Sequence, residues 1–136
     1  MLTWAATYLA TGLAFLALDA IWLSFAAGRI YRPKLGPLLL EGFNVAPAAA
    51  FYLIYIAGIV VFAVAPGLGG GRWTGALAHG AMLGLVAYAT YDLTNQATLR
   101  GWAASVTLAD LCWGTVVTGA AASVGFFVAR RMRGLG

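Results

Sequence analysis

Four long apolar stretches dominate this sequence of 136 residues and dictate the kind of fold that it can adopt. They cover about residues 3–27, 45–65, 73–99 and 103–129. Each holds the roughly 20 residues that a helix needs to cross the hydrocarbon core of a bilayer. Because 62% of the residues are hydrophobic and only 9% are charged, no hydrophilic domain is left over. We therefore predict an all-α membrane protein, a compact bundle of four transmembrane helices with a long first connection, forming a single integral-membrane domain over residues 1–136.

The connections between these stretches are marked by proline, glycine and basic residues. The longest one, residues 28–44, contains Pro33 and Pro37, which argue against a regular helix there. Residues 66–71 are rich in glycine and predict a flexible turn, and residues 100–102 predict a tight turn. The chain is thus expected to cross the membrane from its first stretch onwards.

The basic residues in the connections do not decide the orientation of the bundle. We name the side that holds the amino terminus side X and the opposite side Y. Side X collects Arg72, Arg130, Arg131 and Arg133, and side Y collects Arg29, Arg32, Lys34 and Arg100. Because loop lysines and arginines normally set the orientation, this tie leaves two alternatives open. Either another signal orients the chain, or it inserts both ways and pairs as an antiparallel dimer.

Three of the four acidic residues, Asp19, Asp92 and Asp110, lie inside the apolar stretches. A carboxylate at membrane depth costs roughly 2.5 kcal/mol or more, so each one needs a partner, a proton or a water-filled cavity. Counting the helical rise from the side-Y ends places all three about 10 to 12 Å below that surface. The sequence therefore predicts one layer of carboxylates contributed by three different helices.

Other polar and aromatic residues are expected in the same layer. The third stretch carries Tyr91, Asp92 and Asn95 on one helical stripe, together with Tyr88 and Thr98. A tryptophan follows two of the aspartates by three residues, so that its indole N–H can reach a carboxylate. Tyr52 and Tyr55 complete a wall. The candidate substrate- or ion-binding residues are Asp19, Asp92, Asp110, Asn95, Tyr91, Trp22, Trp113 and Tyr55.

Three carboxylates packed together in a low dielectric cannot all stay charged without compensation. The compensation would come from one of three sources: a proton, a cation (metal, sodium or organic), or a basic side chain that bends back from a connection. The alternative is a structural role, in which hydrogen bonds from neighbouring Trp, Tyr, Asn or Thr side chains let the aspartates fix helix packing. One face of the fourth stretch carries Thr107, Asp110, Gly114 and Thr118. The small residues on this face favour close approach of another helix.

The sequence gives little support for several other classes of function. His79 is the only histidine and lies near side X, away from the aspartates, so no metal site is predicted. Serine, histidine and cysteine residues form no nucleophile motif, so we lean against an enzyme, and the sequence leaves any cofactor unknown. The lone Cys112 excludes an internal disulfide. The net charge of +4 comes from basic residues at the ends of the stretches, which suits membrane lipids and not nucleic acid.

Several short runs resemble a known family. They are Y-D-L-T-N-Q-A-T-L at residues 91–99, L-D-A-I-W-L at 18–23, F-Y-L-I-Y at 51–55 and D-L-C-W-G at 110–114. Together they resemble the bacterial family of small membrane proteins called domain of unknown function 2177. The resemblance implies a multi-pass protein of the bacterial inner (cytoplasmic) membrane with four spans. It implies no established activity, so it assigns no catalytic residues.

Three hypotheses follow for the function. The first is a small proton- or cation-coupled transporter, permease-like, whose three aspartates form a binding site open toward side Y. The second is a lipid-modifying or lipid-handling membrane enzyme that draws a headgroup or acyl chain into the polar layer. The third is a non-catalytic subunit or assembly factor of a larger membrane complex. Membrane lipids and either a second copy of the chain or a larger complex are the expected partners.

Overall fold

The computed structural model describes residues 1–134, in which every regular element is a helix. The last two helices of the chain are long: α5 (Trp73–Thr98) and α6 (Ala104–Met132). The other elements are α1 (Leu2–Ala26), η1 (Ala27–Tyr31), α2 (Arg32–Leu35), η2 (Gly36–Leu38), α3 (Val45–Ile59), η3 (Val60–Val64) and α4 (Ala65–Gly69).

Three continuous helical segments of the described chain are long and apolar enough to cross a membrane: Leu2–Leu38, Val45–Gly69 and Ala104–Met132. The fourth long helix, α5, has 26 residues and is thus about 39 Å long, which is also sufficient. It is more polar because its second half carries the stripe of Tyr, Asp, Asn and Thr residues. The prediction of an all-α bundle of four membrane helices is confirmed.

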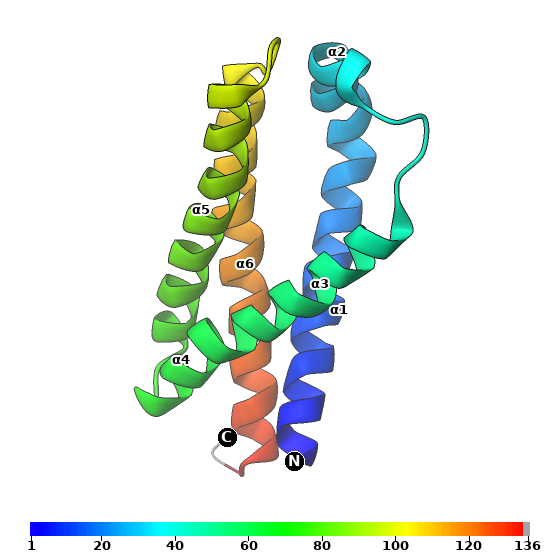
Figure 1. The fold of residues 1–136 in the computed structure, drawn as a ribbon. Coiled ribbons are helices and arrows are strands. Elements are labelled where there is room, and N and C mark those ends of the chain that lie inside the picture. Colours follow the sequence, from blue (N-terminus) through cyan, green and yellow to red (C-terminus); the bar gives the residue numbers. More distant parts are fainter. Residues whose placement is uncertain (135–136) are drawn as a thin grey trace.

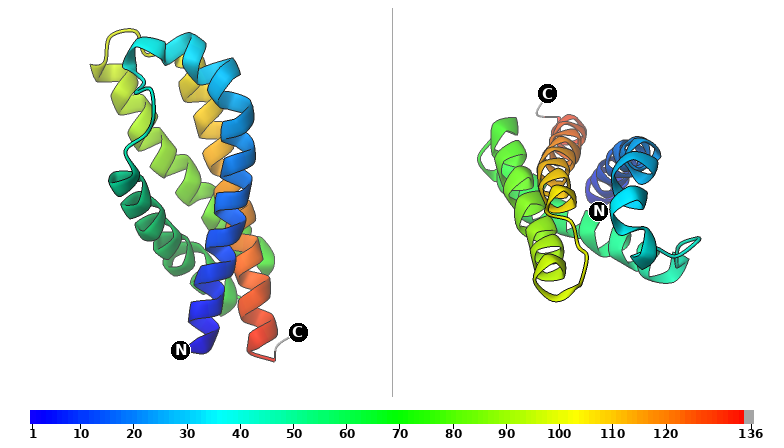
Figure 2. Two further views of the ribbon diagram at one scale, coloured as in Figure 1. Left: turned by 90° about the vertical axis from the view of Figure 1, so that its right-hand side faces the viewer. Right: turned by 90° about the horizontal axis from the view of Figure 1, so that it is seen from above.

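The four helices form a layer of three with the fourth laid across it (Figure 1). Helix α6 lies between α1 and α5 and packs against both, while α3, η3 and α4 run diagonally over one face of this layer. Both termini and the α4–α5 turn lie at one end, side X, and the α5–α6 turn and α2 lie at the other, side Y (Figures 1 and 2).

The diagonal helix differs from the expected second span. It begins near the middle of the bundle and not at side Y, and an irregular segment, residues 39–44, descends to it (Figure 1). The side-Y half of this face is therefore left without a covering helix. Tyr52 and Tyr55 still reach the predicted carboxylate layer because the whole helix starts deeper than the sequence suggested.

Two segments of π-helix explain why prolines do not end the helices where expected. The segment η1 precedes Pro33 and η3 precedes Pro66, and in both cases the helix continues beyond the proline. Proline lacks an N–H and its ring collides with a carbonyl one turn earlier, and a local widening of the helix relieves that collision. The first connection is consequently helical as far as Leu38, contrary to our expectation of an irregular segment from Gly28.

The closest packing in the bundle is between α5 and α6. A Cβ atom added at Gly84 would lie 2.0 Å from the carbonyl oxygen of Gly114, and one added at Gly114 would lie 2.3 Å from the ring of Tyr88. Helices in lipid associate largely through such backbone contact, because lipid is as apolar as their side chains. The predicted small-residue face of the fourth stretch is confirmed, since Thr107, Gly114 and Thr118 are all buried in it.

The apolar core lies below the carboxylate layer, toward side X. Phe15 of α1, Ile59 of α3 and Phe126 of α6 are fully buried there, and Ala76 of α5 joins them. Every long helix therefore contributes to one core, and this core holds the polar layer above it in place.

Candidate functional site

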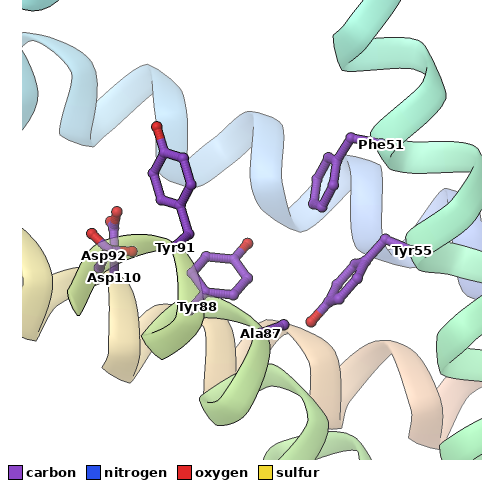
Figure 3. A pocket seen from close by; sticks show the side chains of 7 residues that line it. All are labelled: Phe51, Tyr55, Ala87, Tyr88, Tyr91, Asp92 and Asp110. Carbon is purple, nitrogen blue, oxygen red and sulfur yellow. The ribbon is translucent and has the colours of Figure 1, made fainter. Parts of the chain in front are cut away.

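The most unusual group in the bundle is the carboxyl of Asp92, which has no exposed surface. Neither of its oxygens receives a hydrogen bond from any donor in the described residues. Its acidic neighbour is the carboxyl of Asp110 on α6, which lies beside it at the same end of a pocket (Figure 3). Two carboxyls can share a hydrogen bond only when one of them carries a proton. In a low dielectric, a proton or a cation is what would let two neighbouring carboxyls stay buried.

Asp110 has a second neighbour, Tyr31, which connects it to the segment that follows α1. The hydroxyl of Tyr31 in η1 donates to Asp110 Oδ1 and accepts a hydrogen bond from Trp22 Nε1 at 2.9 Å. The π-segment after α1 brings Tyr31 back toward α6, although 79 residues separate it from Asp110. Trp22 thus reaches a carboxylate through a tyrosine and not directly.

Asp19 lies in the same layer but in surroundings of its own. It accepts hydrogen bonds from Tyr52 Oη at 2.6 Å and from Trp113 Nε1 at 3.1 Å. Although Trp113 follows Asp110 by three residues on α6, its indole N–H donates to Asp19 of the neighbouring helix α1. The rings of Trp22 and Trp113 stack, with centroids 4.9 Å apart and planes 8° from parallel. This stack joins the surroundings of Asp19 to those of Asp110.

A pocket of about 310 Å³ opens beside the carboxyl pair (Figure 3). Asp92 and Asp110 lie at one end of it, and aromatic rings from α3 and α5 form the rest. Its complete lining is Phe51, Tyr55, Ala87, Tyr88, Tyr91, Asp92 and Asp110. The hydroxyl of Tyr55 is held by a hydrogen bond of 2.8 Å with Thr118 Oγ1 of α6. At the mouth, Phe51 and Tyr91 are 46% and 61% exposed.

The predicted candidate residues fall into three groups in the structure. Tyr55, Tyr91, Asp92 and Asp110 line the pocket. Asp19, Trp22 and Trp113 form the hydrogen-bonded and stacked group next to it. Asn95 is half-buried on α5, and its amide makes no side-chain hydrogen bond within the described residues; only its backbone carbonyl accepts one, from the Leu99 N–H.

The three carboxylates therefore share a layer but do not converge on one point. Within residues 1–134, no three His, Cys, Asp or Glu side chains come close enough to hold a metal ion. Asp19 already accepts two hydrogen bonds, whereas Asp92 accepts none. His79 hydrogen-bonds to the carbonyl of Gly75 on its own helix and does not join the layer. The site thus centres on Asp92 and Asp110.

Sequence reasoning missed Tyr31. It lies in the connection that was expected to be irregular, so no helical spacing related it to the aspartates. The one available signal was an aromatic residue between basic residues, Arg29 and Arg32, which by itself indicates only a membrane interface.

The fold defines an all-helical membrane protein, and its bundle buries Asp19, Asp92 and Asp110. Residues 4–127 match the family model described as a predicted membrane protein, domain of unknown function 2177. Because this match covers nearly the whole chain, the protein belongs to that family, and the resemblance seen in the sequence is confirmed. No curated protein and no solved structure matches the chain.

Proposed function

We propose that this protein is a small coupled transporter of the bacterial inner membrane in which the Asp92–Asp110 pair binds a proton and exchanges it for a cation. The observation that carries the proposal is the Asp92 carboxyl, fully buried, without a donor, and facing a second carboxyl. Buried acidic residues of this kind in membrane helices are a frequent mark of proton and ion pathways.

The charges around the pair support exchange over a fixed structural role. Within residues 1–134, the polar groups that act on Asp92 and Asp110 are each other, Tyr31 and Asp19, and none of these is a cation. A structural carboxylate would be expected to have donors, as Asp19 has in Tyr52 and Trp113. The pair instead needs a removable positive charge, and a proton and a cation can compete for the same oxygens.

Access from side Y is supported by the uncovered half of the bundle face. The irregular segment 39–44 lies there, and its backbone polar groups cannot face lipid without hydrogen-bonding partners. Irregular backbone at membrane depth is tolerated where it lines water or is covered by protein. A hydrated opening would let protons and solutes reach the pocket, whose mouth at Phe51 and Tyr91 lies at the edge of α3.

Proteoliposomes test the proposal directly. Vesicles that contain an acidic buffer and a fluorescent pH indicator are diluted into an alkaline buffer that holds sodium, potassium or benzyltrimethylammonium. Wild-type protein should release protons faster than empty vesicles with at least one of these cations. The triple variant Asp19→Asn, Asp92→Asn, Asp110→Asn should lose this release while it keeps its helical circular dichroism.

The fourth acidic residue supplies a matched control. Glu41 is exposed in the first connection, so Glu41→Gln makes the same chemical change outside the layer and should release protons like the wild type. Equal rates for the wild type and the triple variant with every cation would overturn the proposal. Since one bundle of four helices offers little room for alternating access, we also expect the active form to be a dimer.

The pocket mouth favours one alternative, a lipid-handling role. Phe51 and Tyr91 expose large aromatic surfaces beside the acidic pair, and an acyl chain could lie between α3 and α5. Native mass spectrometry of protein extracted with its lipids tests this alternative. A lipid that remains bound to the wild type and is lost from Phe51→Leu would support it, and no retained lipid would count against it.

A further inference from the structure

We propose that the pocket between α3 and α5 is a binding site for a hydrophobic organic cation, such as a quaternary ammonium ion that bears an aromatic or alkyl group. This inference rests on the proposed function and names the solute that would be exchanged for protons. It is carried by the position of an unpartnered acidic pair at one end of a pocket whose other walls are aromatic rings (Figure 3).

The acidic end supplies the charge. Asp92 is fully buried, both of its oxygens lack partners, and it lines the pocket together with Asp110. A small metal cation such as Ca²⁺ or Mg²⁺ demands six or more oxygen ligands or retained waters, which an apolar pocket with two carboxyls does not provide. A quaternary ammonium ion needs no such coordination shell, because alkyl groups surround its charged nitrogen.

The aromatic end supplies a surface for such groups. Phe51 and Tyr55 of α3 lie with ring centroids 5.2 Å apart, and Tyr55 meets Tyr88 of α5 edge-on at 6.5 Å. Tyr91 adds a fourth ring at the mouth. Aromatic faces attract organic cations, and quaternary ammonium groups are commonly recognised by several rings together with a nearby negative charge.

The groups that face the acidic pair also make cation binding depend on pH. In the described part of the chain they are Asp19 from α1, Tyr31 from η1, Tyr55 from α3 and Tyr88 from α5, with no Lys, Arg or His among them. A proton held by the pair must therefore leave when a cation binds. Where the pair is protonated, the affinity for the cation should fall by up to about tenfold per unit decrease in pH.

Calorimetry on protein in nanodiscs of zwitterionic lipid tests the inference. The probe is benzyltrimethylammonium, and the control probe is neopentylbenzene, which has the same shape without the charge. The cation should bind at least tenfold more tightly than the neutral compound and should release protons, measured by repeating the titration in buffers of different ionisation enthalpy. Equal affinity for the two compounds, or no binding of the cation above empty nanodiscs, would overturn the inference.

A matched pair of variants tests the aromatic wall. Phe51→Leu should weaken binding of the cation about 2- to 5-fold, the usual size for a cation–π contact at an exposed site. Phe62→Leu, on the same continuous helix but outside the pocket and 63% exposed, should leave the affinity unchanged. Equal effects of the two substitutions would refute the aromatic contribution.

The acidic end is tested by Asp92→Asn, which should abolish proton release upon binding. Because Phe51 is half-exposed, its leucine variant keeps the test valid if Asp92→Asn fails to fold. The two proposals fail in different ways. Proton release from proteoliposomes with sodium or potassium, combined with no binding of benzyltrimethylammonium, would refute the organic cation and leave coupled transport standing. Absence of proton release with every cation would refute coupled transport itself.

Discussion

The hydroxyl of Tyr31 joins the first helical segment to the acidic site by a hydrogen bond to Asp110, so its removal should measurably destabilise the bundle. The substitution Tyr31→Phe keeps the ring and deletes the hydroxyl. It removes a hydrogen bond donated by Trp22 and another donated to Asp110. The bond to Asp110 joins the first helical segment to α6, in addition to the Trp113–Asp19 hydrogen bond and the packing of α1 on α6.

The magnitude follows from the two bonds that are lost. A hydrogen bond between neutral groups contributes about 1 kcal/mol, and one to a carboxyl contributes about 1.5 to 3 kcal/mol. Because Tyr31 is only half-buried, water replaces part of what is lost. We expect Tyr31→Phe to lower the free energy of unfolding by about 2 to 3 kcal/mol.

Unfolding by a denaturing detergent in mild-detergent micelles, followed by circular dichroism, measures this change. Tyr91→Phe is the matched control, because the Tyr91 side chain is 61% exposed and its hydroxyl makes no hydrogen bond in the described chain. It should change stability by less than about 0.5 kcal/mol. A double-mutant cycle should give a coupling of about 1 kcal/mol or more between Tyr31→Phe and Asp110→Asn, and almost none with Asp19→Asn. A Tyr31→Phe protein as stable as the Tyr91→Phe protein would refute the reasoning.

Other predictions concern packing and buried hydroxyls. Gly84→Ala should destabilise the bundle by roughly 2 kcal/mol or more, because its Cβ would collide with the backbone of Gly114. Gly28→Ala, with open space around it, should be nearly neutral. Equal stabilities of the two variants in thermal unfolding would contradict this prediction. Thr11→Val should leave stability unchanged or increased, because the buried Thr11 hydroxyl has no partner. Thr118→Val should cost about 1 to 3 kcal/mol, because it leaves the buried Tyr55 hydroxyl without its hydrogen bond, and the opposite order of these two variants would count against the assigned contacts.

Much of the fold was accessible from the sequence because lipid imposes simple rules. The four long apolar helices, the turn at Gly101 and the small-residue face of α6 all follow from hydrophobic length, glycine and residue spacing. The common layer of Asp19, Asp92 and Asp110 followed from helical rise, and the hydrogen bonds across helices agree with it. Each of these features depends on one helix at a time.

Features that depend on how the helices cross could not be predicted from the sequence. The tilt of the helix formed by α3, η3 and α4, and with it the uncovered side-Y half of one face, depends on contacts of α3 with α1 and of η3 and α4 with α5. No single stretch of sequence encodes these contacts. The π-segments before Pro33 and Pro66 kept two helices going where proline suggested an end. As a result, the layer could be predicted from helical rise, but the separation of Asp19 from the Asp92–Asp110 pair and the role of Tyr31 could not.

The central claim is that Asp92 and Asp110 hold a proton that a cation can displace. Infrared spectroscopy of the purified protein in low-salt buffer, at a pH at which the exposed Glu41 is ionised, tests it most directly. We predict a carboxylic-acid C=O band that is lost in Asp92→Asn and in Asp110→Asn, retained in Glu41→Gln, and diminished when benzyltrimethylammonium is added to the wild type. A wild-type spectrum without that band, or a band that persists in both Asp→Asn variants, would contradict the claim.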